Sequence, residues 1–408
     1  MSKRLHLFQG YGVELEYMIV DKNTLAVKPI ADEILKAIAD EYVNDVELNG
    51  IAWSNELVLH VIELKTNGPA KTLHGLSDMF HKNVLHINSI LEKHNAILLP
   101  TGAHPFMDPY TETKLWPHEY NPVYETYDRI FDCRGHGWSN LQCIHLNFPF
   151  ANDIEFGKLH AAIRLILPIL PAITASTPII DRKSTGLLDS RLEYYRKNQS
   201  KIPSLTGNVI PERVYTRKDY EEQIFNRIFN DITPFDPDEI MRYEWLNSRG
   251  AIARYDRYTI EIRTVDIQEC PKADIAIVNL ISSLLQNLVS ERWCSTTAQM
   301  KWDEKDLAKI LLDNIRTAEN TLITNKDYLA MFGYQGKGVC TSTDLWRHII
   351  AEIIEDNDTL SSLNIILNEG TLATRILKSV KNDFTLSNLQ KVYRDLSYSL
   401  IQNELYIP

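Results

Sequence analysis

Apolar residues follow two different periods along the 408-residue chain, and the change falls near residue 270. Before that point, short apolar runs bounded by turn residues predict β-strands. These runs are GVELEYMIV (12–20), ELVLHVIEL (56–64), NAILLP (95–100), NLQCIHLNF (140–148) and YTIEIRTVD (258–266). Apolar residues at three- and four-residue steps predict helices over 31–42 and 69–94, and over most of the chain after Pro271. The pattern predicts an α+β protein with a strand-rich body over about 1–270 and a helical part over about 271–408.

The first predicted strand contains two carboxylates, Glu14 and Glu16, among apolar residues. Side chains alternate faces in a strand, so both point the same way, roughly 7 Å apart. At an effective dielectric constant near 20, two such charges repel each other by about 2 to 3 kcal/mol. Either water screens them on a solvated edge, or a cation lies between them. This motif alone leaves both interpretations open.

Three other predicted strands also carry polar residues on an apolar background. They supply Glu56 and Glu63, then His145 and Asn147, then Glu261, Arg263 and Asp266. The spacing of two within the pairs His145/Asn147 and Glu261/Arg263 places each pair on one strand face. Singly, such residues also fit a buried core histidine or a surface ion pair. Glu56 and Glu63 are seven apart, so in an unbroken strand they would face opposite sides unless a bulge intervenes.

Convergence of these four polar faces would place several carboxylates in one space. Such groups must be protonated or neutralised by a metal ion. Oxygen ligands with one imidazole suit Mg²⁺ or Mn²⁺, and a carboxylate-rich magnesium site usually holds phosphates. The sequence therefore favours a metal and phosphate site on the strand-rich body.

The amino-acid composition limits the kinds of binding partner and the cellular setting that we expect. A formal net charge of -11 provides no basic surface for nucleic acid or anionic lipid. The five cysteines form no C-x-x-C pair, which is typical of reduced thiols in a cytosolic protein. The most apolar stretch, 159–180, contains Arg164, Pro168 and Pro171. These residues favour a buried, kinked helix over a membrane span, and we expect no signal peptide.

Five ordered motifs carry a family resemblance. They are G-x-E-x-E at 12–16, E-L-K-T-N at 63–67, TGAHPF at 101–106, I-H-L-N at 144–147 and I-E-I-R-T at 260–264. In this order over about residues 9–280, the chain resembles the type 2 glutamate-cysteine ligase family of ATP-dependent carboxylate-amine ligases, related more distantly to glutamine synthetase. One departure is Cys143, which stands where many relatives have a second histidine.

The resemblance implies a curved, mainly antiparallel β-sheet that forms an active-site funnel, flanked by helices, within a single catalytic domain over residues 1–408. It also implies site roles. The metal ligands or their close supports are Glu14, Glu16, Glu56, Glu63, His145 and Glu261. Arg263 would hold the transferred phosphoryl group beside Glu261, and Asn147 would contact substrate. Arg191 is a candidate carboxylate clamp, with a surface helix arginine as the alternative. Gly102 and His104 fit a tight turn better than substrate contact.

The implied reaction joins the γ-carboxylate of glutamate to the amine of cysteine through an acyl phosphate, with Mg²⁺ or Mn²⁺ as cofactor and ATP as co-substrate. A cytoplasmic role in glutathione biosynthesis would follow. Another amine, or a non-catalytic nucleotide-binding homologue, remains an alternative, and the sequence does not indicate an oligomeric state. No G-x-x-x-x-G-K-[ST] phosphate loop is present, so metals and arginine would have to hold ATP.

Overall fold

The structure is a computed structural model that describes residues 4–336 and 338–408. Within these residues, eight strands form one antiparallel sheet in the order β2-β3-β4-β1-β6-β10-β9, with β5 also paired to β1. Two small two-stranded sheets, β7-β8 and β11-β12, lie outside it. The sheet strands are β1 (Gly12–Asp21), β2 (Asp45–Leu48), β3 (Ile51–Asn55), β4 (Val61–Thr66), β5 (Ala96–Leu99), β6 (Cys143–Pro149), β9 (Ala251–Arg254) and β10 (Thr259–Asp266).

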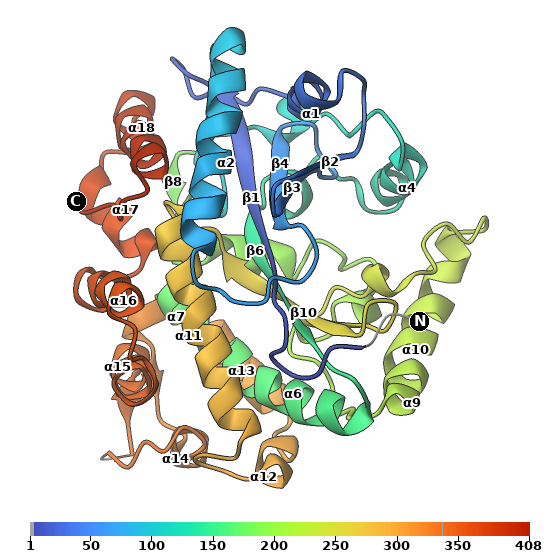
Figure 1. Cartoon of the computed structure of the whole chain (residues 1–408), viewed down its shortest axis with the longest axis vertical. Helices are drawn as coiled ribbons and strands as arrows, with labels where there is room; N and C mark the ends of the chain where they lie inside the picture. The colour runs from blue at the N-terminus through green and yellow to red at the C-terminus, as the bar shows by residue number, and fades with distance from the viewer. Residues whose placement is uncertain (1–3, 337) are drawn as a thin grey trace.

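Helices surround this sheet, and Figure 1 shows α2 passing in front of β1 and α11 following below α2, while the C-terminal helices lie along one side. The longer helices before residue 270 are α1 (Ala31–Ala39), α2 (Leu76–Leu91), α4 (Asn121–Phe131), α6 (Asp153–Ile166), α8 (Ser190–Tyr195) and α10 (Asn226–Ile232). Those after it are α11 (Pro271–Val289), α13 (Glu304–Thr317), α15 (Ser342–Ile353), α16 (Asn357–Glu369), α17 (Leu372–Val380) and α18 (Leu386–Gln402). The short α-helices are α3 (Pro109–Glu112), α5 (His136–Ser139), α7 (Pro171–Thr174), α9 (Arg217–Tyr220), α12 (Thr296–Met300) and α14 (Lys326–Ala330). The short strands are β7 (Ile179–Ile180), β8 (Lys183–Ser184), β11 (Leu322–Ile323) and β12 (Cys340–Thr341).

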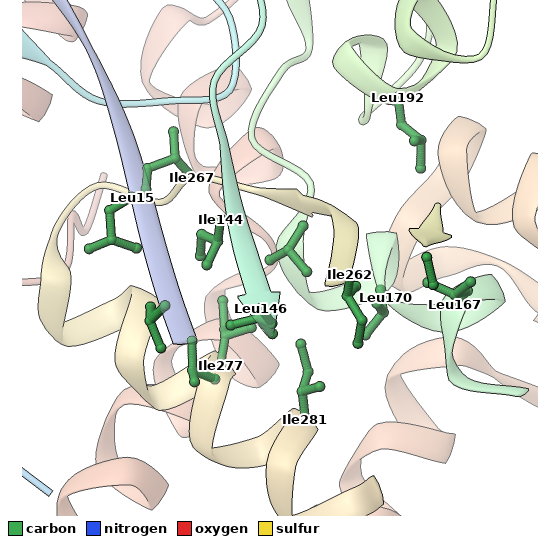
Figure 2. Packing of buried hydrophobic residues seen from close by; sticks show 14 of the residues in the cluster. Leu15, Ile144, Leu146, Leu167, Leu170, Leu192, Ile262, Ile267, Ile277 and Ile281 are labelled. Atoms are coloured by element: carbon green, nitrogen blue, oxygen red, sulfur yellow. The ribbon is translucent and has the colours of Figure 1, made fainter. Parts of the chain in front are cut away.

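One face of the sheet is packed with aliphatic side chains. Leu15 of β1, Leu146 of β6 and Ile262 of β10 are buried there, and Ile277 and Ile281 of α11 lie against them (Figure 2). Because side chains alternate along a strand, this packing turns the intervening residues to the opposite side. We call that side the polar face; it carries Glu14, Glu16, Glu63, His145, Asn147 and Glu261.

The helical C-terminal part covers one end of the same side. Met18 and Val20 continue the alternation of Glu14 and Glu16 along β1. They are buried in a second apolar cluster with Ile97 and Leu99 of β5 and with residues of α17 and α18, including Leu372, Ile376, Leu389, Val392 and Leu396. The carboxylates of β1 therefore begin where this apolar cover ends.

The predicted α+β class, with its large antiparallel sheet and helical C-terminal part, is confirmed. Residues 159–180 form the expected kinked, buried segment, in which Arg164 donates hydrogen bonds to the Pro211 and Trp302 carbonyls. Among the described residues, no helix combines the length and the hydropathy that crossing a membrane requires. The single catalytic domain over 1–408 stays a prediction.

The prediction of one strand over 56–64 was wrong in its first half. Residues 56–60 form a turn between β3 and β4. The Leu59 amide donates to the Lys114 carbonyl, and the Trp116 amide donates to the Leu57 carbonyl. These long-range contacts use apolar residues that the local pattern assigned to a strand.

Candidate active site

Strands β1 and β6 hold the centre of the site. The register pairs Glu14 with His145, and Glu16 with Glu63 on the other neighbour, β4. His145 Nδ1 lies 3.0 Å from Glu14 Oε2, and Asn147 Nδ2 donates to Glu14 Oε1 at 3.1 Å. Glu14 and Glu16 therefore share a face of β1, as their spacing predicted, and His145 lies on the same face of the sheet.

Glu16 is fixed by the strand beside it. The Cys143 amide donates to Glu16 Oε2 at 2.8 Å, and Cys143 Sγ lies 3.4 Å from the same oxygen. The Glu16 side chain is 7 % exposed. Burial raises its pKa, and the nearby carboxylate of Glu63 adds to this rise.

The turn between β3 and β4 settles how Glu56 and Glu63 meet. Glu56 lies in the turn and Glu63 on the polar face of β4, so the seven-residue spacing imposes no opposite facing. Ligand oxygens of Glu16, Glu56 and Glu63 all lie within 4.8 Å of one another. Burial and neighbouring carboxylates raise the pKa of Glu56 well above its usual range. The sheet thus gathers three carboxylates that are costly to ionise together.

A β-bulge interrupts the pairing of β10 with β6 next to the polar face. Ile262 pairs with Leu146 while Val265 pairs with Ile144, so one extra residue of β10 lies at Arg263 and Thr264. Before the bulge, Glu261 pairs with Asn147 and joins the polar face. Arg263 Nε donates to Glu261 Oε1 at 2.5 Å, and the Arg263 side chain is 21 % exposed.

Charge balance differs across the site. For Glu261, burial alone would raise the pKa, but Arg263, His145 and Arg254 lower it to about 2. Burial would also raise the pKa of Glu14, but the hydrogen bond and charge of His145 lower it overall. The excess of negative charge therefore lies at Glu16, Glu56 and Glu63, whose pKa values are all raised, with burial as the first cause.

This donor set fits a divalent cation. A second triad, Glu14, Glu63 and His145, also brings its ligand atoms within 4.8 Å of one another. Several carboxylate oxygens with one imidazole match the ligands that Mg²⁺ and Mn²⁺ take. Burial and the neighbouring carboxylates together raise the three pKa values, and a cation here would offset both effects.

Comparison with known proteins assigns the chain that carries this site to a protein family. The family model described as glutamate-cysteine ligase family 2 matches residues 11–388, more than half of the chain. The chain belongs to this family. The predicted resemblance is confirmed, and the family supports the coarser class of carboxylate-amine ligase.

The similarity of this chain to individual relatives is moderate or low. An uncharacterized protein of Archaeoglobus fulgidus is 37% identical over 280 residues, covering 69% of this chain and 75% of that protein. A Bradyrhizobium diazoefficiens protein named "Putative glutamate-cysteine ligase 2" is 25% identical over 365 residues, covering 86% and 74%. The crystal structure of glutamate-cysteine ligase from Francisella tularensis in complex with AMP superposes with a TM-score of 0.57 at 12% identity, covering 96% of this chain and 88% of that chain. At that identity the likeness shows the fold.

Two residues of this ligase-family chain that the sequence singled out, Arg191 and His104, are buried and bonded to other residues of the protein. The Arg191 side chain is 1 % exposed and forms a buried ion pair with Asp266. This placement excludes the surface helix arginine. His104 is buried and its Nε2 bonds the Leu25 carbonyl, while burial lowers its pKa to about 4. A Cβ at Gly102 would lie 2.9 Å from the Asp266 side chain and 3.1 Å from that of Arg191, so glycine permits close packing there.

Sequence reasoning missed three polar residues around the carboxylates. Lys65 Nζ donates to Glu63 Oε1 at 3.0 Å and to Ser54 Oγ at 2.8 Å. Arg254 of β9 lies 3.3 Å from Glu261 Oε2. Lys65 stands two residues after Glu63, so the same period of two could have found it. Strands β3 and β9 carried no comparable pattern, and Ser54 and Arg254 had no local signal.

Proposed function

We propose that this chain is an ATP-dependent ligase that joins the γ-carboxylate of glutamate to the amine of cysteine. One observation carries the proposal: Glu14, Glu16, Glu56, Glu63, His145 and Glu261 converge beside Arg263, on a chain of glutamate-cysteine ligase family 2. A cluster of this kind suits the binding of a triphosphate through metal cations. The carboxylates would bind and orient the cations, and the cations would neutralise the negative charge of the phosphates.

The reaction would have two steps. A carboxylate oxygen of glutamate attacks the γ-phosphorus of ATP, which releases ADP and forms an acyl phosphate. The amine nitrogen then attacks the acyl carbon, and the carbon–oxygen bond to phosphate breaks as the amide forms. A carboxylate oxygen leaves poorly, whereas phosphate leaves well, so the first step makes the second possible.

The acidic and basic residues of the site have different roles in this proposal. Glu16, Glu56 and Glu63 would hold Mg²⁺ or Mn²⁺, with Glu14 and His145 beside them and Glu261 at the β10 end. Bound there, the metal would supply positive charge to the triphosphate and to the moving phosphoryl group. Arg263, held at one end by Glu261, would direct its remaining donors at the equatorial oxygens of that group. Asn147 would contact substrate.

Arg191 is placed to support the site indirectly. Its guanidinium bonds Asp266, the residue of β10 that pairs with Cys143 of β6. We therefore propose a positioning role for Arg191 beside Asp266 of β10, in place of the substrate clamp. This role is tested separately below.

The proposal is tested by ADP release from ATP and Mg²⁺ with glutamate and a panel of amines. The panel contains cysteine, other amino acids, a polyamine and ammonia. We expect release that requires both glutamate and cysteine. Release that prefers another amine would overturn the cysteine assignment and retain the ligase class. ATP binding without release under any combination would support the non-catalytic alternative.

A further inference from the structure

Cys143 gives one side of the site a different set of donors from the rest. Cys143 Sγ lies 3.1 Å from His145 Nε2 and 3.4 Å from Glu16 Oε2. Ligand atoms of Glu16, Cys143 and His145 all lie within 4.8 Å of one another. The three groups offer one oxygen, one sulfur and one nitrogen.

His145 is oriented as a metal-binding histidine is. Its Nδ1 faces Glu14 Oε2 at 3.0 Å, so a proton on Nδ1 would be donated to that carboxylate. Nε2 then presents its lone pair toward Cys143 Sγ and Glu16. A carboxylate on the far ring nitrogen fixes the tautomer and raises the basicity of histidines that bind metals.

This donor set differs chemically from the neighbouring carboxylates. Glu16, Glu56 and Glu63 offer oxygen alone, which suits Mg²⁺. A thiolate with an imidazole and one carboxylate suits Zn²⁺ and similar ions, which prefer sulfur and nitrogen ligands and tetrahedral geometry. Glu16 belongs to both sets, and its two oxygens can serve two ions.

We propose that Glu16, Cys143 and His145 form a separate binding position for a thiophilic divalent ion, of which Zn²⁺ is the best match. The ion would lie next to the all-carboxylate position and share Glu16 with it. The inference rests on the proposed function only for the Mg²⁺ assigned to that neighbouring position. Its own support is the sulfur and nitrogen donors.

The test uses Co²⁺ as a spectroscopic probe on the metal-free, full-length chain, with a phosphine reductant that offers no competing thiol. A bound thiolate produces a sulfur-to-cobalt charge-transfer band in the near ultraviolet. We expect this band to saturate at one Co²⁺ per chain, to disappear when Zn²⁺ displaces the cobalt, and to persist in equimolar Mg²⁺.

Two cysteine variants locate the band. Cys143→Ser should lose it and bind Zn²⁺ at least about 10-fold more weakly, since even loss of a partner that orients a ligand costs about 10- to 100-fold. Cys294→Ser is the matched control, because Cys294 Sγ bonds the Met331 carbonyl instead of the polar face. The control should retain the band and the affinity.

A measurement on the wild-type chain covers the case in which Cys143→Ser fails to fold. Alkylation of each cysteine, followed by mass spectrometry, should show that Zn²⁺ protects Cys143 and leaves Cys294 unchanged. No band in the wild type, an equal band in folded Cys143→Ser, or no protection of Cys143 would each overturn the inference.

Magnesium-dependent ADP release by the wild-type chain, with zinc chelated, separates this inference from the proposed function. Turnover without a cobalt band overturns the thiophilic position alone. A cobalt band without turnover overturns the ligase proposal alone.

Discussion

Arg263 combines a fixed end with an accessible one. Its Nε is bonded to Glu261, and the side chain retains 21 % exposure on the polar face. The planar guanidinium offers several donors in a fixed arrangement, whereas a lysine ammonium is a compact point charge. Substitution by lysine therefore separates geometry from charge at this residue.

Arg263→Lys should lower kcat by about 100- to 1,000-fold, the typical loss for one donor that acts mainly in the transition state. KM for ATP should stay within a few-fold, because the charge that attracts the triphosphate remains. Steady-state kinetics measure both. Arg257→Lys is the matched control, since Arg257 is exposed in the turn between β9 and β10. A kcat for Arg263→Lys within a few-fold of wild type would assign Arg263 to structure.

Glu56 should destabilise the metal-free protein at neutral pH. Its pKa is raised well above the usual range, first by burial and then by Glu16. A carboxyl group with a raised folded pKa contributes stability at low pH that is lost as pH rises through that pKa. Glu56→Gln should therefore raise the metal-free unfolding midpoint at about pH 8 and weaken the response to Mg²⁺.

Thermal unfolding with and without Mg²⁺ measures both effects of Glu56→Gln. Glu125→Gln, on the exposed side of α4, supplies the control and should change neither. A lower midpoint for Glu56→Gln without metal, or an undiminished Mg²⁺ response, would contradict the crowding of charge at this residue.

At the scale of elements, period-two patterns predicted how β1, β6 and β10 present their polar residues. Side chains alternate along each strand, so the sequence could assign Glu14 with Glu16, His145 with Asn147, and Glu261 with Arg263 to a shared strand face. That these three faces meet on one side of the sheet followed from the order of the family motifs. Two features had no local signal. The turn at 56–60 depends on contacts with residues 114–116, and the bulge at Arg263 depends on pairing with β6. Long-range contacts overrode the local pattern in both places.

The bulge also determines on which side of the sheet Asp266 lies. The extra residue returns Asp266 to the side that carries Cys143, its partner on β6. There, Asp266 accepts from Arg191 and from the Ser176 amide and Thr177 hydroxyl. The pair links α8 to β10 in the buried interior.

Asp266→Ala should lower the free energy of unfolding by about 3–5 kcal/mol, because it leaves the buried Arg191 without its carboxylate. Urea denaturation measures the loss. Replacing both partners, as Arg191→Met with Asp266→Leu, should recover most of it. If Arg191→Met instead stays as stable as wild type and raises KM for glutamate, Arg191 is the substrate clamp and not a positioning residue.

At the scale of the whole molecule, negative charge predominates both in the chain as a whole and at the carboxylates that the sheet brings together. The net charge is -11, and Glu16, Glu56 and Glu63 meet beside an apolar wall formed with α17 and α18. Their raised pKa values mean that the metal-free protein retains protons that the unfolded chain would release. Metal binding must displace those protons.

The shift of the unfolding midpoint by Mg²⁺ should therefore be larger at about pH 8 than at about pH 5.5, because fewer protons compete for the carboxylates. Differential scanning calorimetry at both pH values, with Na⁺ at matched ionic strength as the control, measures it. A shift that is equal at both pH values, or larger in acid, would contradict a site built from these three carboxylates.

The central claim is that this polar face activates a carboxylate by phosphorylation, and the fate of one oxygen atom tests it most directly. Glutamate labelled in its γ-carboxylate with the heavy stable isotope of oxygen is turned over with ATP, Mg²⁺ and the preferred amine. The released phosphate is then analysed by mass spectrometry. We predict one labelled oxygen in each phosphate, because the acyl phosphate leaves with an oxygen that came from glutamate. Phosphate without label, released at the rate of amide formation, would contradict the claim.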